Sequence, residues 1–424
     1  MRMCLPCDTH RGLNRRDVLA RLAAGSALAC GCVAVSGCTT NPATGGQMLG
    51  LSSVQDDVRQ GTQAYPELIK AFGGAYGTDS LQSYVTDVGR RVAATTELPD
   101  LPYEFTVLNS PIINAMALPG GKIAITRGLL ALAGTEAELA GVLAHEVGHV
   151  NARHGAQAQG RATIAQLGLA VLGIATGSRE LVELGSSVAS TFLQKYSRDQ
   201  EFEADSLGVR YLSRSGYDPA AMASFLGSMR EQSQVEATMQ GLPPGEVDEY
   251  NIMASHPRTV ERVQQAAAAA GTIAVANPAV RQAEYLSAIN GLLFADDPAQ
   301  GFVRGRQFIH TGLRLAFEVP DGFIIRNGAE QVTAQDKYGS AIVFDAAPVQ
   351  RSRNLLEYLQ YEWVTDIRLS NLESIRVNGI AAATGAARVQ ASNGVADLRV
   401  VAYDAGRGQV YRFLFVTDAR TGGA

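Results

Sequence analysis

The sequence lacks an excess of positive charge and any long basic run. Its 36 Lys and Arg residues are outnumbered by 41 Asp and Glu residues, which leaves a formal net charge of −5 at pH 7. Proteins that grip nucleic acid usually present a broad cationic face, so we expect no nucleic-acid partner. Apolar residues make up 46% of the 424 residues, which is enough for a sizeable core and for two or three domains.

Cysteine is scarce and is confined to the first 38 residues. The five cysteines are Cys4, Cys7, Cys30, Cys32 and Cys38. The CxxC spacing of the first two occurs in metal and redox sites, but both lie in a segment that we expect to be removed. We therefore predict neither a disulfide nor a cysteine metal site in the mature chain.

Long apolar runs are also missing. Residues 22–37 form an apolar stretch, but a helix needs about 20 such residues to span a bilayer. The stretch follows Arg15 and Arg16 and ends in Val-Ser-Gly-Cys at Cys38, an order typical of a secretory signal with a lipobox. We expect residues 1–37 to be a signal peptide and Cys38 to be lipidated; an ordinary signal peptide cut nearby is the alternative. Residues 14–19 resemble a twin-arginine signal, so both export routes stay open.

The rest of the chain divides into three regions by pattern. Residues 38–53 are rich in Thr, Gly, Asn and Pro, which predicts a flexible lipidated tether. Residues 54–285 have a mostly helical pattern with a strand-like insert at 103–126. Residues 300–424 alternate as strands around one helix, which predicts a small α+β domain of unknown role. The expected strands lie at 313–319, 341–344, 386–390, 397–403 and 409–416, and the helix at 355–364.

His145-Glu146-Val-Gly-His149 is the sharpest motif in the sequence. Residues four apart on a helix lie on one face, so His145 and His149 can bind one metal ion while Glu146 acts as general base on water. Thr135 and Glu138 have the spacing of a capping box, and apolar residues follow at helical intervals. The histidines are therefore expected on a buried helix; two core histidines with a chance glutamate are the alternative.

A catalytic zinc ion needs a third protein ligand and an open fourth position. Residues 199–205 hold two rival carboxylates. Glu201 shares its helical face with small residues such as Gly208, which let another helix approach closely, whereas Glu203 lies on an ordinary flank and is expected to be solvated. We predict Glu201 as the ligand and Asp205 as the residue that orients a zinc-binding histidine. The alternative is an acidic helix start favoured by the helix dipole.

Three further features lie near this motif in the sequence. His256 precedes Pro257, which places it in an extended segment where it could stabilise a transition state, close the resting site as a fourth ligand, or simply be exposed. His154 lies nine residues after His145, roughly on the opposite side of a continuous helix, and is expected to be structural or solvent-exposed. Residues 167–176 are apolar and form either a buried helix or a mobile lid.

These motifs together resemble peptidase family M48, the gluzincins that include the HtpX heat-shock protease and the CAAX prenyl proteases. The resemblance rests on His145-Glu146-x-x-His149, on residues 201–205, on residues 114–121 and on Ser-His-Pro at His256 with Arg262. Its soluble envelope members, the beta-barrel assembly-enhancing proteases, are the nearer relatives. The resemblance implies a mainly helical zincin-type domain, one Zn²⁺ ion per chain, and a supporting role for Arg262.

We therefore expect a metalloendopeptidase that cleaves unfolded or misfolded envelope proteins. It would lie in the periplasm, held by the lipid on Cys38, and the outer membrane is favoured as the anchoring membrane. The outer-membrane assembly machinery is an expected partner. The alternative is a zinc-gated periplasmic chaperone or outer-membrane assembly factor with little proteolysis. Residues 300–424 show no 34-residue tetratricopeptide period, unlike the assembly-enhancing proteases, so the specific partners of those proteins do not transfer directly.

Overall fold

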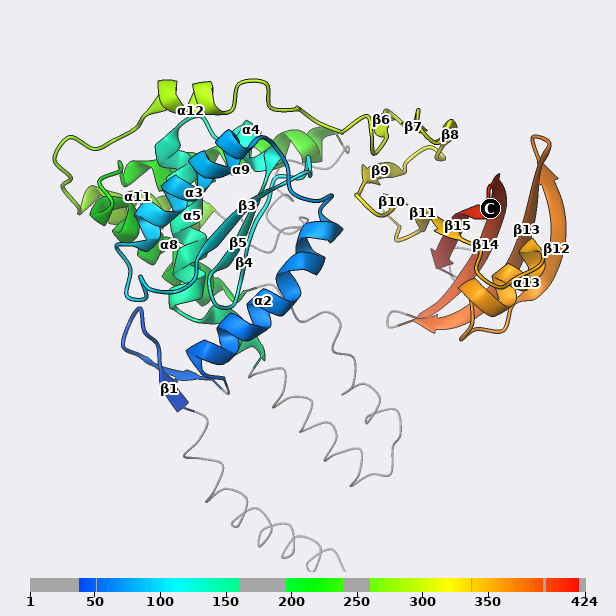
Figure 1. The fold of residues 1–424 in the computed structure, drawn as a ribbon, viewed down its shortest axis with the longest axis horizontal. Helices are drawn as coiled ribbons and strands as arrows, with labels where there is room; N and C mark the ends of the chain where they lie inside the picture. Colours follow the sequence, from blue (N-terminus) through cyan, green and yellow to red (C-terminus); the bar gives the residue numbers. More distant parts are fainter. Residues whose placement is uncertain are drawn as a thin grey trace, which may run out of the picture.

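The computed structural model describes residues 38–50, 52–159, 196–239, 260–336, 338–391 and 394–418. In these residues, helices surround a small sheet in the N-terminal part, and a larger sheet forms the C-terminal part (Figure 1). This mixture confirms the predicted α+β fold class. The predicted site residue His256 and the apolar segment 167–176 lie outside the described residues.

A three-stranded sheet forms the centre of the N-terminal part. It consists of β3 (Glu104–Leu108), β4 (Ala115–Leu118) and β5 (Lys122–Thr126) in the order β3-β5-β4, with β3 parallel and β4 antiparallel to β5. Helix α2 (Val54–Ala71) packs on one face of the sheet, where Tyr65 contacts its apolar side chains. Helices α3 (Asp79–Ala93) and α5 (Glu136–Asn151) pack on the other. The sheet is therefore covered on both faces, and β4 forms one of its edges.

Helix α5 runs through the core, and every one of its residues is buried. Its first turn is capped by Thr135, whose Oγ1 accepts a hydrogen bond from the backbone N–H of Glu138 at 3.1 Å. The Glu138 carboxylate accepts from the N–H of Gly134, not from that of Thr135, so only half of the predicted capping box forms. The expectation of a buried helix for the histidine motif is correct.

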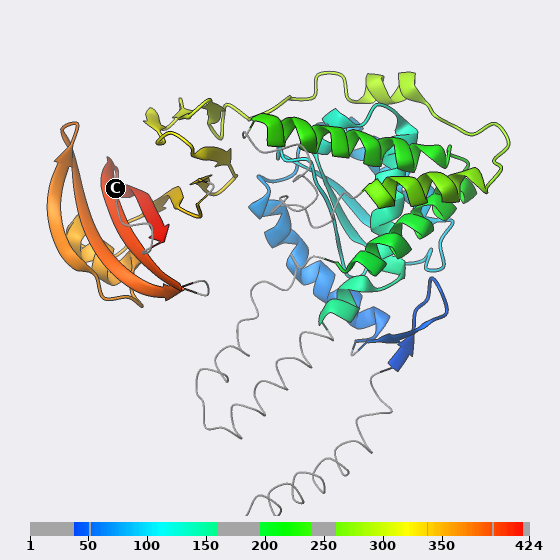
Figure 2. The same cartoon turned by 180° about the vertical axis from the view of Figure 1, so that it is seen from behind.

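Helix α8 (Arg198–Arg214) lies against α5, and glycines allow the close approach. A Cβ at Gly148 of α5 would lie 3.1 Å from the carbonyl oxygen of Ala204, and one at Gly208 of α8 would lie 3.2 Å from the backbone nitrogen of His145. Helices α9 (Ala220–Met239) and α11 (Val260–Gly271) complete this group and lie side by side in the view from behind (Figure 2). Two shorter helices are α4 (Arg127–Leu132) and α12 (Gln282–Ala288).

The segment expected to be a flexible tether begins with a hairpin. Strands β1 (Cys38–Thr40) and β2 (Gln47–Leu49) pair antiparallel, and Asn41, Ala43 and Met48 are buried against the N-terminal part. Local composition does not reveal this docking, because the contacts come from residues far away in the sequence. Arg210, for example, donates to the carbonyl oxygen of Ala43 at 3.1 Å.

Two antiparallel sheets make up the C-terminal part. The smaller contains β6 (Phe302–Arg304), β7 (Gln307–His310) and β8 (Leu315–Glu318). The larger has seven strands in the order β12-β13-β14-β15-β11-β10-β9. Its strands are β9 (Ile324–Asn327), β10 (Val332–Gln335), β11 (Ala341–Pro348), β12 (Ser370–Val377), β13 (Ile380–Ala391), β14 (Gly394–Gly406) and β15 (Gln409–Asp418). The predicted helix appears as α13 (Leu355–Tyr358) with a π-helical turn (Leu359–Trp363), and it packs on one face of the larger sheet.

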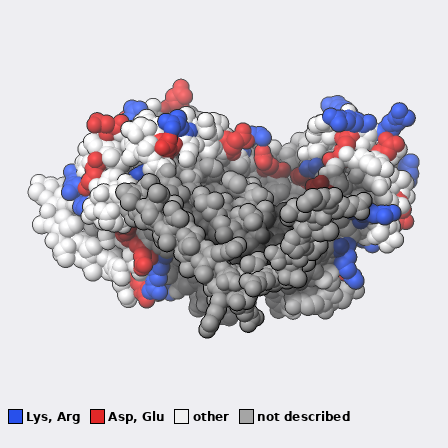
Figure 3. All heavy atoms as spheres, turned by 90° about the horizontal axis from the view of Figure 1, so that it is seen from below, with Lys and Arg blue, Asp and Glu red and all other residues white. Residues whose placement is uncertain are grey.

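On the face drawn in Figure 3, acidic and basic side chains of the described residues are interspersed. Among the described helices, none is both long enough and apolar enough to cross a bilayer.

Candidate metal centre

Two histidines of α5 and one carboxylate of α8 meet in the core. The Nε2 atoms of His145 and His149 are 3.0 Å apart. The Glu201 carboxylate lies 3.6 Å from each of these nitrogens, through Oε2 to His145 and Oε1 to His149. All three side chains are buried, and their donor atoms lie within 4.8 Å of one another. The structure thus brings together the three residues predicted as ligands.

The donor set suits a zinc ion. Ligand atoms about 2.0–2.1 Å from a tetrahedral zinc ion lie about 3.3 Å from one another, close to the 3.0–3.6 Å observed. Two imidazole nitrogens and one carboxylate oxygen are also the ligand types of many catalytic zinc sites, which leave one position for water or substrate. This cluster is the one metal-binding group of His, Cys, Asp and Glu found in the described residues.

Asp205, predicted to orient a ligand histidine, and Arg262, to which the resemblance gives a supporting role, both contact the cluster. The Asp205 Oδ1 lies 2.9 Å from His145 Nδ1, on the far side of the ring from the cluster. Arg262 of α11 donates to both oxygens of Asp205 at 2.7 Å, and its Nη1 lies 2.8 Å from Glu201 Oε2. Burial alone would raise the pKa of Asp205, but hydrogen bonds from Arg262 and His145 hold it well below its usual range.

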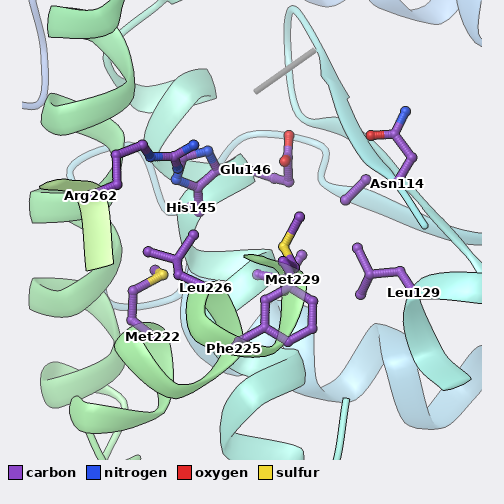
Figure 4. Close-up of a pocket in the computed structure, with 11 residues that line it drawn as sticks. Asn114, Leu129, His145, Glu146, Met222, Phe225, Leu226, Met229 and Arg262 are labelled. Carbon is purple, nitrogen blue, oxygen red and sulfur yellow. The ribbon is translucent and has the colours of Figure 1, made fainter. Parts of the chain in front are cut away.

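Glu146 borders a small apolar pocket beside the cluster (Figure 4). The carboxylate group is almost fully buried. Asn114 and Arg262 line opposite sides of the pocket (Figure 4). The cavity holds about 40 Å³, enough for a few water molecules. The rest of its lining is apolar and consists of Ala115, Leu129, Val142, Met222, Phe225, Leu226 and Met229. Sequence reasoning missed this pocket, because its lining residues come from β4, α4, α5 and α9.

His154 is placed differently from the expectation of a position on the opposite side of the helix. Its ring is fully buried, and its Nδ1 lies 2.8 Å from Nδ1 of the predicted ligand His149. The reason is a turn: α5 ends at Asn151, and Arg153 adopts a left-handed φ of 55°, so the count of residues per helical turn does not continue to His154.

Glu203, expected to be solvated, is the partner of His154. Its Oε2 lies 3.0 Å from His154 Nε2, and its side chain is 29% exposed. A hydrogen bond from His154 lowers the pKa of Glu203 against the effect of burial. The face of α8 that carries Glu203 therefore also belongs to the site. The sequence signal that could have identified Glu203 as a site residue is its position two residues after the predicted ligand Glu201.

Tyr196 is a site residue that sequence reasoning missed. Its ring stacks on that of His149, with a centroid distance of 4.0 Å and an interplanar angle of 18°. Burial, together with the negative charges of Glu146 and Glu201, raises the pKa of Tyr196 well above its usual value, so the phenol stays protonated. The residue directly precedes the capping box of α8, formed by Ser197 and Gln200, but no sequence pattern linked it to the histidines.

Comparisons with known proteins show a similarity to peptidases. A model of "Peptidase family M48" matches residues 79–270. The chain is 30% identical over 292 residues to "Beta-barrel assembly-enhancing protease" of Yersinia pestis, which covers 66% of this chain and 54% of that protein. It is 30% identical over 195 residues to the protein of that name from Escherichia coli strain K12, covering 44% and 38%. It is 39% identical over 128 residues to "Mitochondrial metalloendopeptidase OMA1" of Arabidopsis thaliana, covering 30% and 26%.

The matched range contains the whole cluster, from His145 to Arg262, and also the small sheet. The chain spans about half of the length of the first of these relatives, and less of the others. Residues 79–270 of this chain are a domain of peptidase family M48.

Proposed function

We propose that this protein is a zinc-dependent endopeptidase of the bacterial cell envelope that cleaves unfolded or misfolded proteins. The observation that carries the proposal is the convergence of two histidine nitrogens and one carboxylate beside the buried Glu146. Membership of residues 79–270 in a peptidase family, and relatives named as proteases, support the same activity. We take residues 54–285 as the catalytic domain and 300–424 as a small α+β domain of unknown role.

In this proposal His145, His149 and Glu201 bind one zinc ion per chain. Zinc, when bound, supplies a Lewis acid for the scissile carbonyl and lowers the pKa of water to about 7. Asp205 holds the ring of His145 through its outer nitrogen, 2.9 Å away. Arg262 balances the two buried carboxylates of Glu201 and Asp205, so the site keeps its charges without exposing them to solvent.

Glu146 is the proposed general base. It follows His145 on α5, and its carboxylate borders the pocket, where it can take a proton from the attacking water and deliver it to the leaving amine. Positioned proton transfer of this kind accelerates a reaction by about 10²–10⁴-fold. His256 is proposed to stabilise the developing oxyanion.

The substrate is proposed to bind as an extended strand along β4. This strand is at the edge of its sheet and pairs only with β5 among the described strands. Backbone pairing with an edge strand requires no particular side chains and suits an unfolded polypeptide. Ala115, the first residue of β4, lines the pocket that Glu146 borders, so a peptide paired there passes the proposed base. An apolar side chain next to the cleaved bond would enter the pocket.

The proposed location is the periplasm, with a lipid on Cys38 as the anchor and a lean towards the outer membrane. The support is the lipobox order of residues 35–38 after an apolar stretch too short to span a bilayer. The name of the bacterial relatives refers to β-barrel assembly. That name and the proposed lipid anchor support two further parts of the proposal: misfolded envelope proteins as substrates and the outer-membrane assembly machinery as a partner.

The test is degradation of casein by the purified chain, with zinc quantified and Glu146→Gln measured in parallel. We expect one zinc per chain in both proteins and cleavage by the wild type alone. Zinc without cleavage by either protein would favour the chaperone alternative, and Glu146→Gln would then retain the function of the wild type in cells. No zinc in the wild type would overturn the proposed mechanism.

A further inference from the structure

A chain of hydrogen-bonding side chains leads from the N-terminal hairpin to the metal centre. His149 Nδ1 lies 2.8 Å from His154 Nδ1, and His154 Nε2 lies 3.0 Å from Glu203 Oε2. The other oxygen of Glu203, Oε1, accepts from Asn41 Nδ2 at 3.0 Å. The chain thus joins four residues from three segments that are far apart in the sequence.

With both imidazoles neutral, one arrangement of protons satisfies these contacts. A carboxylate accepts, so His154 must donate to Glu203 through Nε2, and a neutral imidazole then accepts at Nδ1. That Nδ1 faces His149, which must therefore carry its own proton on Nδ1. The Nε2 of His149, which points into the cluster, is left with a lone pair. This is the tautomer that a metal-binding histidine needs.

Neighbouring residues hold this series of hydrogen-bonded side chains in place. Arg153 turns the backbone between His149 and His154, and its guanidinium donates to Asp57 Oδ2 at 2.7 Å and to the carbonyl oxygen of Ser52 at 2.6 Å. Arg153 and Asp57 are both buried. Separating a buried ion pair of this kind leaves a buried charge without its partner, which is strongly destabilising. The turn that brings His154 back to His149 is therefore tied to the residues that follow the hairpin.

We propose that His154 is a positioning residue for His149, held by Glu203 and Asn41, and that docking of the N-terminal hairpin therefore sets how firmly the metal is retained. The inference rests on the proposed zinc site and extends it to a segment that contributes no ligand. Residues that hydrogen-bond to a zinc ligand typically change metal affinity by about 10–100-fold when removed. Asn41 belongs to the hairpin and lies three residues after Cys38, and Glu203 and His154 link it to the proposed ligand His149.

The experiment measures the rate at which zinc leaves the full-length protein. Each variant is loaded with zinc and mixed with an excess of a chromophoric chelator, and the colour change is followed. The variants are His154→Phe, which keeps an aromatic ring without nitrogens, Glu203→Gln and Asn41→Ala. The control is Tyr211→Phe: Tyr211 lies on α8, as Glu203 does, and loss of its hydroxyl removes its hydrogen bond to Glu97 but leaves the contact of Arg210 with the hairpin in place.

We expect His154→Phe to release zinc about 10–100-fold faster than the wild type. Glu203→Gln and Asn41→Ala should also release zinc faster than the wild type, by smaller factors, and Tyr211→Phe should release it at the wild-type rate. The melting temperatures of the metal-free variants should not follow the order of their zinc-release rates. If the role of these residues were merely structural, a lower melting temperature would accompany every faster release. If His154→Phe does not fold, Glu203→Gln decides the question.

Two outcomes overturn the inference. One is zinc release at the wild-type rate from Glu203→Gln and Asn41→Ala; the other is an equal acceleration in Tyr211→Phe, which would indicate general loosening of α8. A wild-type protein that binds no zinc would instead refute the metal centre itself, so the two failures are distinguishable.

Discussion

The guanidinium of Arg262 lies against both carboxylate oxygens of Asp205, with Nε–Oδ2 and Nη2–Oδ1 distances of 2.7 Å each. Both groups are almost fully buried. Such a bidentate pair fixes the relative position of α8 and α11 as well as balancing charge. Since Asp205 also contacts His145, and Arg262 also contacts Glu201, this pair links two of the three proposed ligands.

Replacing Arg262 by Met should therefore destabilise the fold and weaken metal binding together. The change leaves two buried carboxylates, Glu201 and Asp205, without their cation, and removing one partner of a buried ion pair costs about 3–5 kcal/mol. Urea unfolding of the metal-free and zinc-loaded proteins measures the loss. The control is Arg59→Met, which breaks an exposed pair with Asp56 and should cost about 0–1 kcal/mol. Equal losses in the two variants would contradict the proposed role of Arg262.

Glu146→Gln should abolish peptide cleavage and leave the metal in place. The amide keeps the size of the side chain but cannot accept the proton of the attacking water, so we expect a loss of about 10²–10⁴-fold in the rate of casein cleavage. Zinc content, measured by atomic absorption, should equal that of the wild type, since Glu146 is not among the three clustered donors. Cleavage at an undiminished rate would show that another group is the base.

Gly148→Ala should lower the affinity for zinc and have only a small effect on the melting temperature of the metal-free protein. A Cβ there would lie 3.1 Å from the Ala204 carbonyl oxygen and 3.3 Å from Leu207 Cβ, so α5 and α8 must separate slightly. The ligands lie on these two helices. The gain in helix propensity, up to about 1 kcal/mol, offsets part of the strain.

The measurements for Gly148→Ala are zinc affinity by chelator competition and the melting temperature of the metal-free form. Gly227→Ala in α9 is the matched control, because its added Cβ meets no atom within 4 Å. This control should bind zinc normally. Unaltered zinc affinity in Gly148→Ala would mean that the helix spacing does not control the site.

Removal of the metal should lower the melting temperature. An ion that binds only the folded state stabilises it by about 4 kcal/mol at a free concentration 1,000 times its dissociation constant. Differential scanning calorimetry before and after treatment with a chelator measures the shift. Zinc added back should restore the transition, whereas magnesium should not, since it prefers oxygen ligands over the two imidazoles of His145 and His149. A transition that does not depend on zinc would contradict the site.

Met229→Trp should change which peptide bonds are cut. Met229 lines the pocket beside Glu146 and is partly exposed, so a larger ring can occupy the cavity without disrupting the core. Cleavage next to large apolar residues should fall by about 10–200-fold, the range that one methylene group controls in an apolar pocket. Mass spectrometry of casein fragments gives the site preferences. Leu286→Trp, at an exposed position on α12, is the control and should leave them unchanged.

Patterns within single segments were enough to predict several elements. The histidine motif predicted a buried helix, and α5 is buried throughout. Small residues around Glu201 predicted a close approach of another helix, and the contact of Gly208 with the backbone of His145 confirms it. Strand periodicity placed the expected strands of the C-terminal part, where β11, β13, β14 and β15 lie.

The errors share a cause. His154 was placed by extending the period of α5, but a left-handed residue at position 153 ends that period. Glu203 was assigned to solvent because its helical face looked ordinary, yet that face meets the hairpin and His154. No sequence pattern marks Tyr196 as a site residue. Each of these positions depends on a contact with a distant segment.

By itself, the sequence determined which residues can bind a metal ion and activate water. The spacing of His145, Glu146 and His149 is sufficient for this, because residues four apart on a helix share a face. Only the tertiary structure decided what surrounds them. The ion pair of Asp205 with Arg262, the contact of His154 with His149 and the docked hairpin at Asn41 all join segments separated by many residues. Local propensity carries no information about such partners, because their energy comes from burial and hydrogen bonding between distant parts of the chain.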